Sequence, residues 1–282
     1  MNEKYLAGFI DADGHISVRA RVGARPDLLV TISQRALYSA PLDYAKQEFG
    51  GNMRTHSTNG VEFVTLQLRS GPARKCLERL KKYMVLKRHH AERMLELVDS
   101  SYVLKDTDDV QRVRKEVSAI RAYGADRMPN FPSRKWLAGY FDGDGSFNVK
   151  VDKSNGFGYP TASILAAPNY TAGIVLLHGA FGGRICGIKQ NAFWQLSLQP
   201  SKAKQFLSYF AQHLYIKKAQ AYFLLGCAEH NFRDGTTVRN HITALNSQQH
   251  RLSDPEGYAA QLVRSVRFDI PKVKSGRPTL KR

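Results

Sequence analysis

Apolar and polar residues alternate near the start of the chain in a pattern typical of strands with one buried face. Between residues 15 and 22 every second position is apolar, and the positions between them are polar or basic. The apolar set is Ile16, Val18, Ala20 and Val22, and the outward set is His15, Ser17, Arg19 and Arg21. A second strand is predicted over 28–34, with Leu28, Val30 and Ile32 directed inward.

Turn signals and helical spacing predict the other elements of this half. Asn59-Gly60 is a strong two-residue hairpin signal, so strands are expected over 52–57 and 61–69. The inward positions of the second of these strands are Val64, Leu66 and Leu68. A Gly-Gly pair at 50–51 ends a short helix. Helices are expected over 41–49, 72–83 and 87–98.

The second half repeats this order. Phe147, Val149 and Val151 alternate with polar residues, and further strands are predicted over 159–166, 184–189 and 192–199. Trp194, Leu196 and Leu198 occupy the places of Val64, Leu66 and Leu68 and are expected to face inward. Helices are predicted over 170–180, 201–213 and 217–229. The pattern therefore predicts an α+β protein made of two αββαββα repeats.

Four segments follow from this periodicity. The first repeat spans 1–100 and the second spans 134–230. A linker over 101–133 contains a predicted helix at 107–123 and a stiff connector at 128–132 that is rich in proline. Residues 231–282, which have no counterpart in the first half, are expected to form short helices and a basic tail.

A nine-residue motif begins each repeat. It reads LAGFIDADG at 6–14 and LAGYFDGDG at 137–145, with Tyr5 or Trp136 directly before it. Residues four apart share a helix face, so Gly8 with Ala12, and Gly139 with Gly143, allow two helix backbones to approach closely. Such a crossing places Asp13 beside Asp144. Two carboxylates at close range repel each other unless a cation neutralises them, and oxygen ligands suit Mg²⁺ or Ca²⁺.

The charge balance indicates a polyanionic partner. The 282 residues carry 42 Lys and Arg against 24 Asp and Glu, a net charge of +18, which favours nucleic acid. The three cysteines form no CxxC pair, so neither a disulfide framework nor a zinc site is predicted, and a reducing compartment fits. The sequence contains no apolar run long enough for a membrane span and no visible signal peptide, so a soluble protein is expected.

The doubled motif resembles that of the LAGLIDADG homing endonucleases in their single-chain, two-repeat form. This resemblance implies a monomer whose two antiparallel sheets form a saddle over double-stranded DNA. It implies Asp13 and Asp144 as metal ligands, with the main-chain carbonyls of Ala12 and Gly143 beside them. Mg²⁺ is the expected ion, with Mn²⁺ as a substitute and Ca²⁺ binding without supporting cleavage. Asp11 and Asp142 are interpreted as structural hydrogen-bonding groups.

The resemblance also implies residues that support catalysis and contact DNA. Gln34 is expected to orient water, and Lys87 and Lys217 to lie near the acids. The counterpart of Gln34 falls near Ala166-Ala167, where the sequence has no polar side chain. The outward positions expected to contact DNA are Ser17, Arg19, Arg21, Thr31, Ser33, Arg35, Thr65, Gln67, Arg69, Ser146, Asn148, Lys150, Gln195 and Ser197.

The function that these features imply is site-specific cleavage of both DNA strands across the minor groove. The two halves differ at most outward positions, so a long asymmetric target is predicted, and the resemblance implies 3′ overhangs. Two alternatives remain open, an intron maturase that binds its host intron RNA and a DNA-binding protein that does not cut. A weak HNH-like pattern near His230-Asn231 fits a surface loop better. The resemblance suggests an intron-encoded protein of a chloroplast or mitochondrion.

Overall fold

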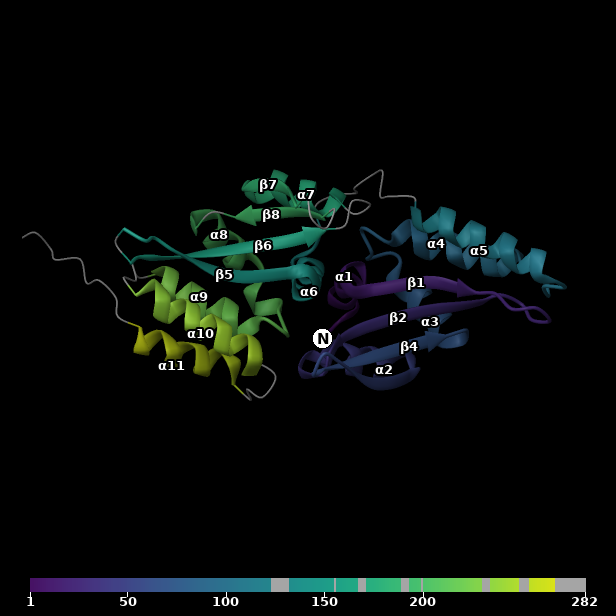
Figure 1. The fold of residues 1–282 in the computed structure, drawn as a ribbon, viewed down its shortest axis with the longest axis horizontal. Coiled ribbons are helices and arrows are strands. Elements are labelled where there is room, and N and C mark those ends of the chain that lie inside the picture. Colours follow the sequence, from purple (N-terminus) through teal and green to yellow (C-terminus); the bar gives the residue numbers. More distant parts are fainter. Residues whose placement is uncertain are drawn as a thin grey trace, which may run out of the picture.

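The computed structural model describes residues 1–122, 132–154, 156–166, 171–188, 193–198, 200–229, 234–248 and 254–266 (Figure 1). The predicted connector at 128–131, the HNH-like pair at 230–231 and the basic tail after residue 266 lie outside these ranges. The first repeat contains α1 Glu3–Asp13, β1 Gly14–Arg19, β2 Asp27–Arg35, α2 Ala40–Phe49, β3 Asn52–Thr58, β4 Val61–Arg69, α3 Gly71–Leu80 and α4 Arg88–Ser100.

The second repeat has the same order of elements. It contains α6 Arg134–Asp144, β5 Gly145–Val151, β6 Gly158–Ala166, α7 Thr171–Phe181, β7 Arg184–Ile188, β8 Phe193–Leu198, α8 Pro200–Phe210 and α9 Lys218–Glu229. Three further helices are α5 Thr107–Ala122, α10 Gly235–Gln248 and α11 Pro255–Ser265. The predicted α+β fold with two equivalent repeats is confirmed.

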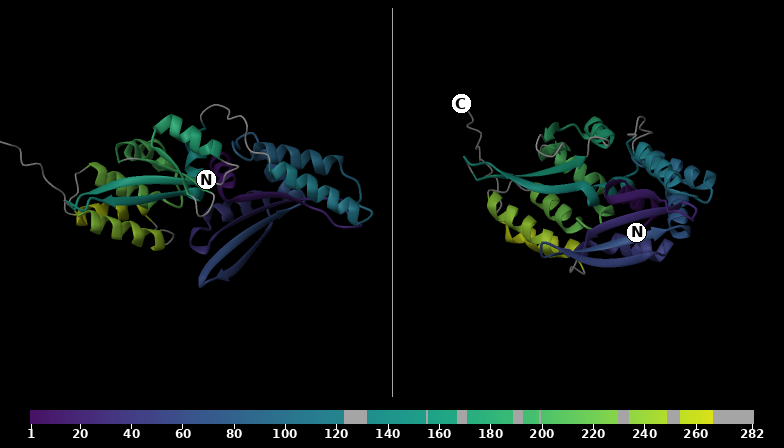
Figure 2. Two further views of the ribbon diagram at one scale, coloured as in Figure 1. Left: turned by 45° about the horizontal axis from the view of Figure 1, so that its top comes forward. Right: turned by 45° about the vertical axis from the view of Figure 1, so that its right-hand side comes forward.

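Each repeat forms one antiparallel sheet of four strands. The strand orders are β1-β2-β4-β3 and β5-β6-β8-β7, and helices pack against one face of each sheet. The central helices α1 and α6 lie side by side between the two sheets, and Figure 2 shows the sheets extending away from them in opposite directions. Gly14 pairs with Ile32 in the first sheet and Gly145 with Ile164 in the second, which fixes the equivalent positions of the two repeats.

Local sequence signals account for the ends of several elements. The Asn2 side chain accepts a hydrogen bond from the Tyr5 amide at 3.0 Å, and Ser133 caps α6 in the same way. Asn59 and Gly60 both have positive φ angles, 52° and 74°, as the tight turn between β3 and β4 requires. The caps at Asn2 and Ser133 begin α1 and α6 at equivalent positions of the two repeats.

The inward faces of the sheets agree with the alternation except at two residues. Val22 is 52% exposed because β1 ends at Arg19, and the chain then turns through Gly23, whose φ is +76°. Trp194 is 42% exposed although Leu196 and Leu198 are buried. It lies near the start of β8, opposite Gly187 and Ala166, where its ring extends past the covered part of the sheet.

Helix α5, which lies in the predicted linker segment 101–133, packs against α4 and β1. Its buried side chains are the predicted Val110, Val113, Val117 and Ile120. Helices α10 and α11 pack against the second repeat. Helix α10 contacts β5 and α9, and helix α11 contacts α9. Within the described ranges no helix is long and apolar enough to cross a membrane.

Candidate active site

The two motif helices cross with their backbones almost in contact. A Cβ atom added at Gly8 would lie 2.0 Å from the carbonyl oxygen of Trp136, and one added at Gly139 would lie 2.0 Å from that of Tyr5. Neither space can hold a side chain, because real Cβ contacts are never this short. The predicted packing of small residues is therefore present, and it brings the ends of both helices together.

The first aspartate of each motif anchors the helices and does not face the site. Asp11 accepts hydrogen bonds from the amides of Val85 and Lys87 at 2.7 and 2.8 Å and from the Trp136 indole at 2.8 Å. Asp142 accepts hydrogen bonds from the amides of residues 215–217 and from the Tyr5 hydroxyl, the last at 2.7 Å. Each aromatic residue that precedes a motif thus donates to the aspartate of the other repeat.

The second aspartates, Asp13 and Asp144, lie where the helices end and the first strand of each sheet begins. A Cβ added at Gly143 would be 3.1 Å from Asp13 Oδ2, so the backbone of one motif adjoins the acid of the other. Burial raises the pKa of Asp13, against the effect of Lys217, Lys87 and Gln34. Burial and then the charge of Asp13 raise the pKa of Asp144 to about 7. The two carboxylates therefore destabilise each other's charged forms.

Lys87 is buried and Lys217 is half-buried against the helix ends. Lys87 is 6% exposed, and its Nζ donates to the carbonyl oxygens of Ile10, Ala12 and Gly14 at 3.0, 3.0 and 2.7 Å. Lys217 donates to the carbonyls of Phe141 and Asp142. Burial lowers the pKa of both amines, and the nearby aspartates oppose this effect. The two lysines place positive charge where the helix dipole is negative, next to the acids.

Gln34 contacts Asp13 directly. Its Nε2 donates to Asp13 Oδ2 at 2.7 Å, and its Oε1 accepts from the amide of Arg35 at 3.0 Å, which fixes the orientation of the amide group. The strand registers make Ala166 the counterpart of Gln34, and Ala166 is buried and apolar. Both halves of the site thus contain an acid and a lysine, but only the first half has an amide side chain at the position of Gln34.

The donor atoms fit a hard divalent cation. Two carboxylates and the neighbouring main-chain carbonyls of Ala12 and Gly143 offer only oxygen, which Mg²⁺ prefers. Among the described residues no group of three or more His, Cys, Asp or Glu side chains comes together, so a complete all-protein cage is not formed there. An ion at this position would complete its coordination with water and phosphate oxygens, as Mg²⁺ commonly does.

Comparison with known proteins identifies the fold. No protein-family profile and no curated protein matches the sequence. Among solved structures, I-SmaMI bound to uncleaved DNA target in the presence of calcium ions has a TM-score of 0.61 at 18% identity, covering 91% of this chain and 98% of that one. The LAGLIDADG homing endonuclease I-GzeII in complex with its DNA target has a TM-score of 0.58 at 14% identity, covering 94% and 97%. The fold is that of the LAGLIDADG homing endonucleases.

In this LAGLIDADG fold, the residues predicted to contact DNA, apart from Arg21, lie on the sheet faces that the helices leave uncovered. Ser33 and Thr65 hydrogen-bond to each other across strands at 2.8 Å, Arg69 donates to Gln67 at 2.7 Å, and Arg19 pairs with Asp27 at 3.4 Å. Ser146, Asn148 and Lys150 are exposed along β5. Arg21 is exposed but lies beyond the end of β1. Thr31, Gln195 and Ser197 occupy strand positions between inward-facing residues, and Arg35 is the exposed last residue of β2.

The sequence analysis missed the uncovered face of β6. Its outward residues are Tyr159, Thr161, Ser163 and Leu165, of which Ser163 bonds Ser146 at 2.8 Å and Leu165 is 41% exposed. The alternation over 159–166 contains the signal needed to find them, because every second residue there is buried. The outward face of β6 is therefore less polar than that of its counterpart β2, which carries Thr31, Ser33 and Arg35.

The raised pKa of Asp144 predicts a stability that depends on pH in metal-free protein. An acid whose pKa rises from 3.8 to about 7 holds its proton more tightly when folded, so the free energy of unfolding falls as pH rises from about 4 to 7. Each unit corresponds to about 1.4 kcal/mol, and since the carboxyl keeps some contact with water we expect a loss of about 2 kcal/mol.

Urea unfolding in EDTA at pH 5 and pH 8 measures this loss. Asp144→Asn removes the titrating group and is expected to flatten the pH dependence, while Asp108→Asn on the exposed side of α5 leaves it as in the wild type. Equal losses for the wild type and Asp144→Asn would contradict the prediction.

Proposed function

We propose that this protein is a site-specific endonuclease that hydrolyses both strands of duplex DNA with the help of a divalent cation. The observation that carries the proposal is the meeting of Asp13 and Asp144 at the crossing of two equivalent helices, with the buried Lys87 and the half-buried Lys217 beside them. A packing role does not account for this pair, because burial of two like charges costs stability in the absence of a cation.

Each repeat contributes one half of the proposed machinery. Asp13 and Asp144 hold the divalent ions, with the carbonyls of Ala12 and Gly143 as further ligands. When bound, Mg²⁺ would polarise the scissile phosphodiester and lower the pKa of a water molecule. Lys87 and Lys217 stabilise negative charge near the acids, and the amide of Gln34 orients Asp13 and the attacking water. The acids face the minor groove, and cuts on both strands leave 3′ overhangs.

The target is proposed to be long and asymmetric. Lys and Arg on the uncovered sheet faces bind phosphates, and Ser, Thr, Asn and Gln read base edges in the major groove. Equivalent positions of the two sheets differ: Ser33 corresponds to Leu165, and Thr31 to Ser163. A palindrome would be read equally by both halves only if these positions matched. The molecule therefore suits two unlike half-sites.

A selection experiment tests this function. A library of randomised duplexes is incubated with the protein in Mg²⁺, and linear products are captured by their 3′ overhangs and sequenced. We expect one enriched asymmetric sequence, no product in EDTA, and recovery of product in Mn²⁺. Tight duplex binding without any cutting in either ion would replace the proposal with the DNA-binding alternative, and preferential binding of intron RNA would favour a maturase.

The contact between Gln34 and Asp13 predicts unequal cutting of the two strands after one substitution. In Gln34→Ala the Asp13 carboxylate loses the amide group that donates to its Oδ2, so cutting at the Asp13 site is expected to slow by about 10–10²-fold. Cutting at the Asp144 site, which has Ala166 at this position, stays unchanged. Nicked DNA then accumulates in single-turnover reactions with each strand labelled separately. Gln111→Ala on the exposed face of α5 is the control, and equal slowing of both strands would contradict the assignment.

A further inference from the structure

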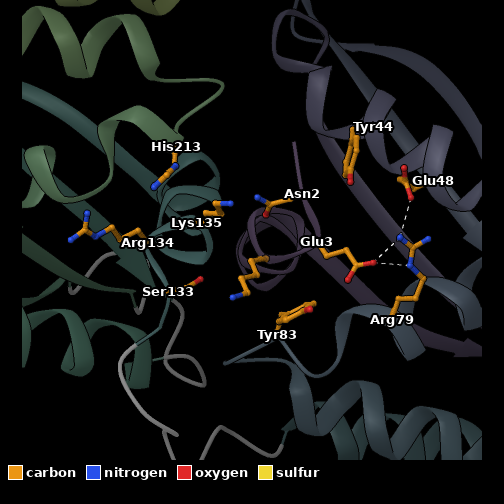
Figure 3. Close-up of a pocket in the computed structure, with 11 residues that line it drawn as sticks. Asn2, Glu3, Tyr44, Glu48, Arg79, Tyr83, Ser133, Arg134, Lys135 and His213 are labelled. Carbon is orange, nitrogen blue, oxygen red and sulfur yellow. Dashed lines mark hydrogen bonds and ion pairs between the residues drawn. The ribbon is translucent and has the colours of Figure 1, made fainter.

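A cleft of about 680 Å³ opens at the N-terminal ends of α1 and α6, between the two repeats (Figure 3). Asp13 and Asp144 lie at the opposite ends of these helices. Each helix has 11 residues, so the cleft is about 16 Å from the acids along the helix axes. A ligand in the cleft and a duplex over the acids would therefore occupy different places on the molecule.

Positive charge gathers on one side of this cleft. Lys4, Arg134 and Lys135 line it, and within the described part of the chain none of them has an ion-pair partner. The two carboxylates of the cleft, Glu3 and Glu48, both bind Arg79, at 2.6 and 3.0 Å. The charges of the cleft that lack an ion-pair partner among the described residues are thus cationic, while its acids are already neutralised on the opposite wall (Figure 3). The Arg134 guanidinium also lies 4.6 Å from the centre of the Tyr209 ring.

His213, which also lines the cleft, lies close enough to these cations for their charge to affect its pKa. Burial lowers its pKa, and the charges of Lys135, Arg134 and Lys218 lower it further. Of these cations, Lys218 is paired with Glu256 at 2.7 Å. The remaining two have no such compensation among the described residues, so an anion placed beside Lys135 and Arg134 would relieve repulsion between like charges.

Aromatic rings lie next to these cations. Tyr83 and Tyr44 line the cleft, and the amines of Lys4 and Lys82 lie 5.8 and 4.9 Å from the centre of the Tyr83 ring. Cationic side chains beside a partly exposed aromatic ring, as Tyr83 is here, are a combination that binds nucleotide units without sequence preference. The cations contact the phosphate while the base stacks on the ring.

We propose that this cleft binds a nucleotide unit, with Lys4, Arg134 and Lys135 on its phosphate and Tyr83 against its base. A base inside a duplex is already stacked on both faces, so the ligand is a free nucleotide or a nucleotide of a single strand. This site is separate from the proposed cleavage site. Its occupation joins residues of both repeats and requires no metal ion.

Fluorescence anisotropy tests the proposal with a short oligothymidylate that carries a 5′ phosphate and a 3′ fluorophore, in EDTA so that no DNA is cut. Wild type is expected to bind it. The double variant Arg134→Gln/Lys135→Gln is expected to bind at least about tenfold more weakly and to lower the slope of log K against log salt by about 1.4, the value for two phosphate contacts to a single strand. Tyr83→Leu is expected to weaken binding while leaving that slope unchanged.

Three controls make the result specific. Lys115→Gln removes a charge from the exposed face of α5 and is expected to bind as the wild type does. If AMP competes as strongly as unlabelled oligonucleotide, the ligand is a free nucleotide. If only the unlabelled oligonucleotide competes, the ligand is a nucleotide of a single strand. Three results would overturn the proposal. The first is displacement of the oligonucleotide by excess duplex, and the second is competition by inorganic phosphate as strong as that by AMP. The third is equal affinity of the double variant and Lys115→Gln for the oligonucleotide. Binding is read without cleavage, so a failure of the proposed nuclease activity leaves this test intact.

Discussion

Asp13→Asn and Asp144→Asn are each expected to reduce formation of linear DNA by about 10³-fold or more, with duplex binding retained. Asparagine keeps the size of the side chain and removes the charge that a divalent cation needs. The stabilisation of transition-state charge by a bound cation contributes several kcal/mol, and each 1.36 kcal/mol corresponds to tenfold in rate. The uncovered sheet faces are unchanged by either substitution, so affinity for duplex is expected to stay within about twofold.

The measurement is a plasmid assay that separates supercoiled, nicked and linear DNA, run beside a gel-shift titration. Asp108→Asn, at an exposed position in α5, is the matched isosteric control and is expected to cut like the wild type. A nicked product from either variant would show that the other acid still supports cutting of one strand. Linear product at the wild-type rate from either variant would remove that acid from the catalytic site.

Gly139→Ala is expected to destabilise the protein by about 4 kcal/mol or more. The added methyl group would lie 2.0 Å from the carbonyl oxygen of Tyr5 and 2.9 Å from the amide nitrogen of Phe9. Both are backbone atoms, so the helices must separate, and overpacking that cannot relax costs more than the usual range of about 1–3 kcal/mol. Separation also moves Asp13 away from Asp144, so cutting is expected to be lost with stability.

Gly179→Ala is the control for this substitution. Gly179 lies in α7, and a Cβ added there would have no atom within 4 Å. Alanine favours helix by up to about 1 kcal/mol over glycine, so this variant is expected to be as stable as the wild type or slightly more so. Equal urea midpoints for Gly139→Ala and wild type would contradict the close crossing of α1 and α6.

The order of helices and strands could be predicted from the sequence because each local signal agrees with the fold. The alternation in β2 and β4, the Asn59-Gly60 turn and the apolar stripe of α5 all lie where they were expected. The exceptions, Val22 and Trp194, lie at strand ends. Periodicity gives the face of a residue, but it does not show where the covering helices stop.

The site could be predicted only as far as its symmetry. The doubled motif places Asp13 beside Asp144, and the resemblance implied Gln34 and the lysines. The hydrogen bonds from Tyr5 to Asp142 and from Trp136 to Asp11 could not be predicted, because they join residues more than 120 positions apart. The burial of Lys87 also required the structure, since a lysine among other basic residues is normally exposed.

Those two crossed hydrogen bonds have a consequence for exchanging halves between related proteins. Each half supplies the aromatic donor that the aspartate of the other half needs, Tyr5 for Asp142 at 2.7 Å and Trp136 for Asp11 at 2.8 Å. A chimera whose new half has phenylalanine at either position leaves a buried carboxylate without that donor, at a cost of about 1–3 kcal/mol. Halves that recombine well must therefore match in these donors as well as in their glycines.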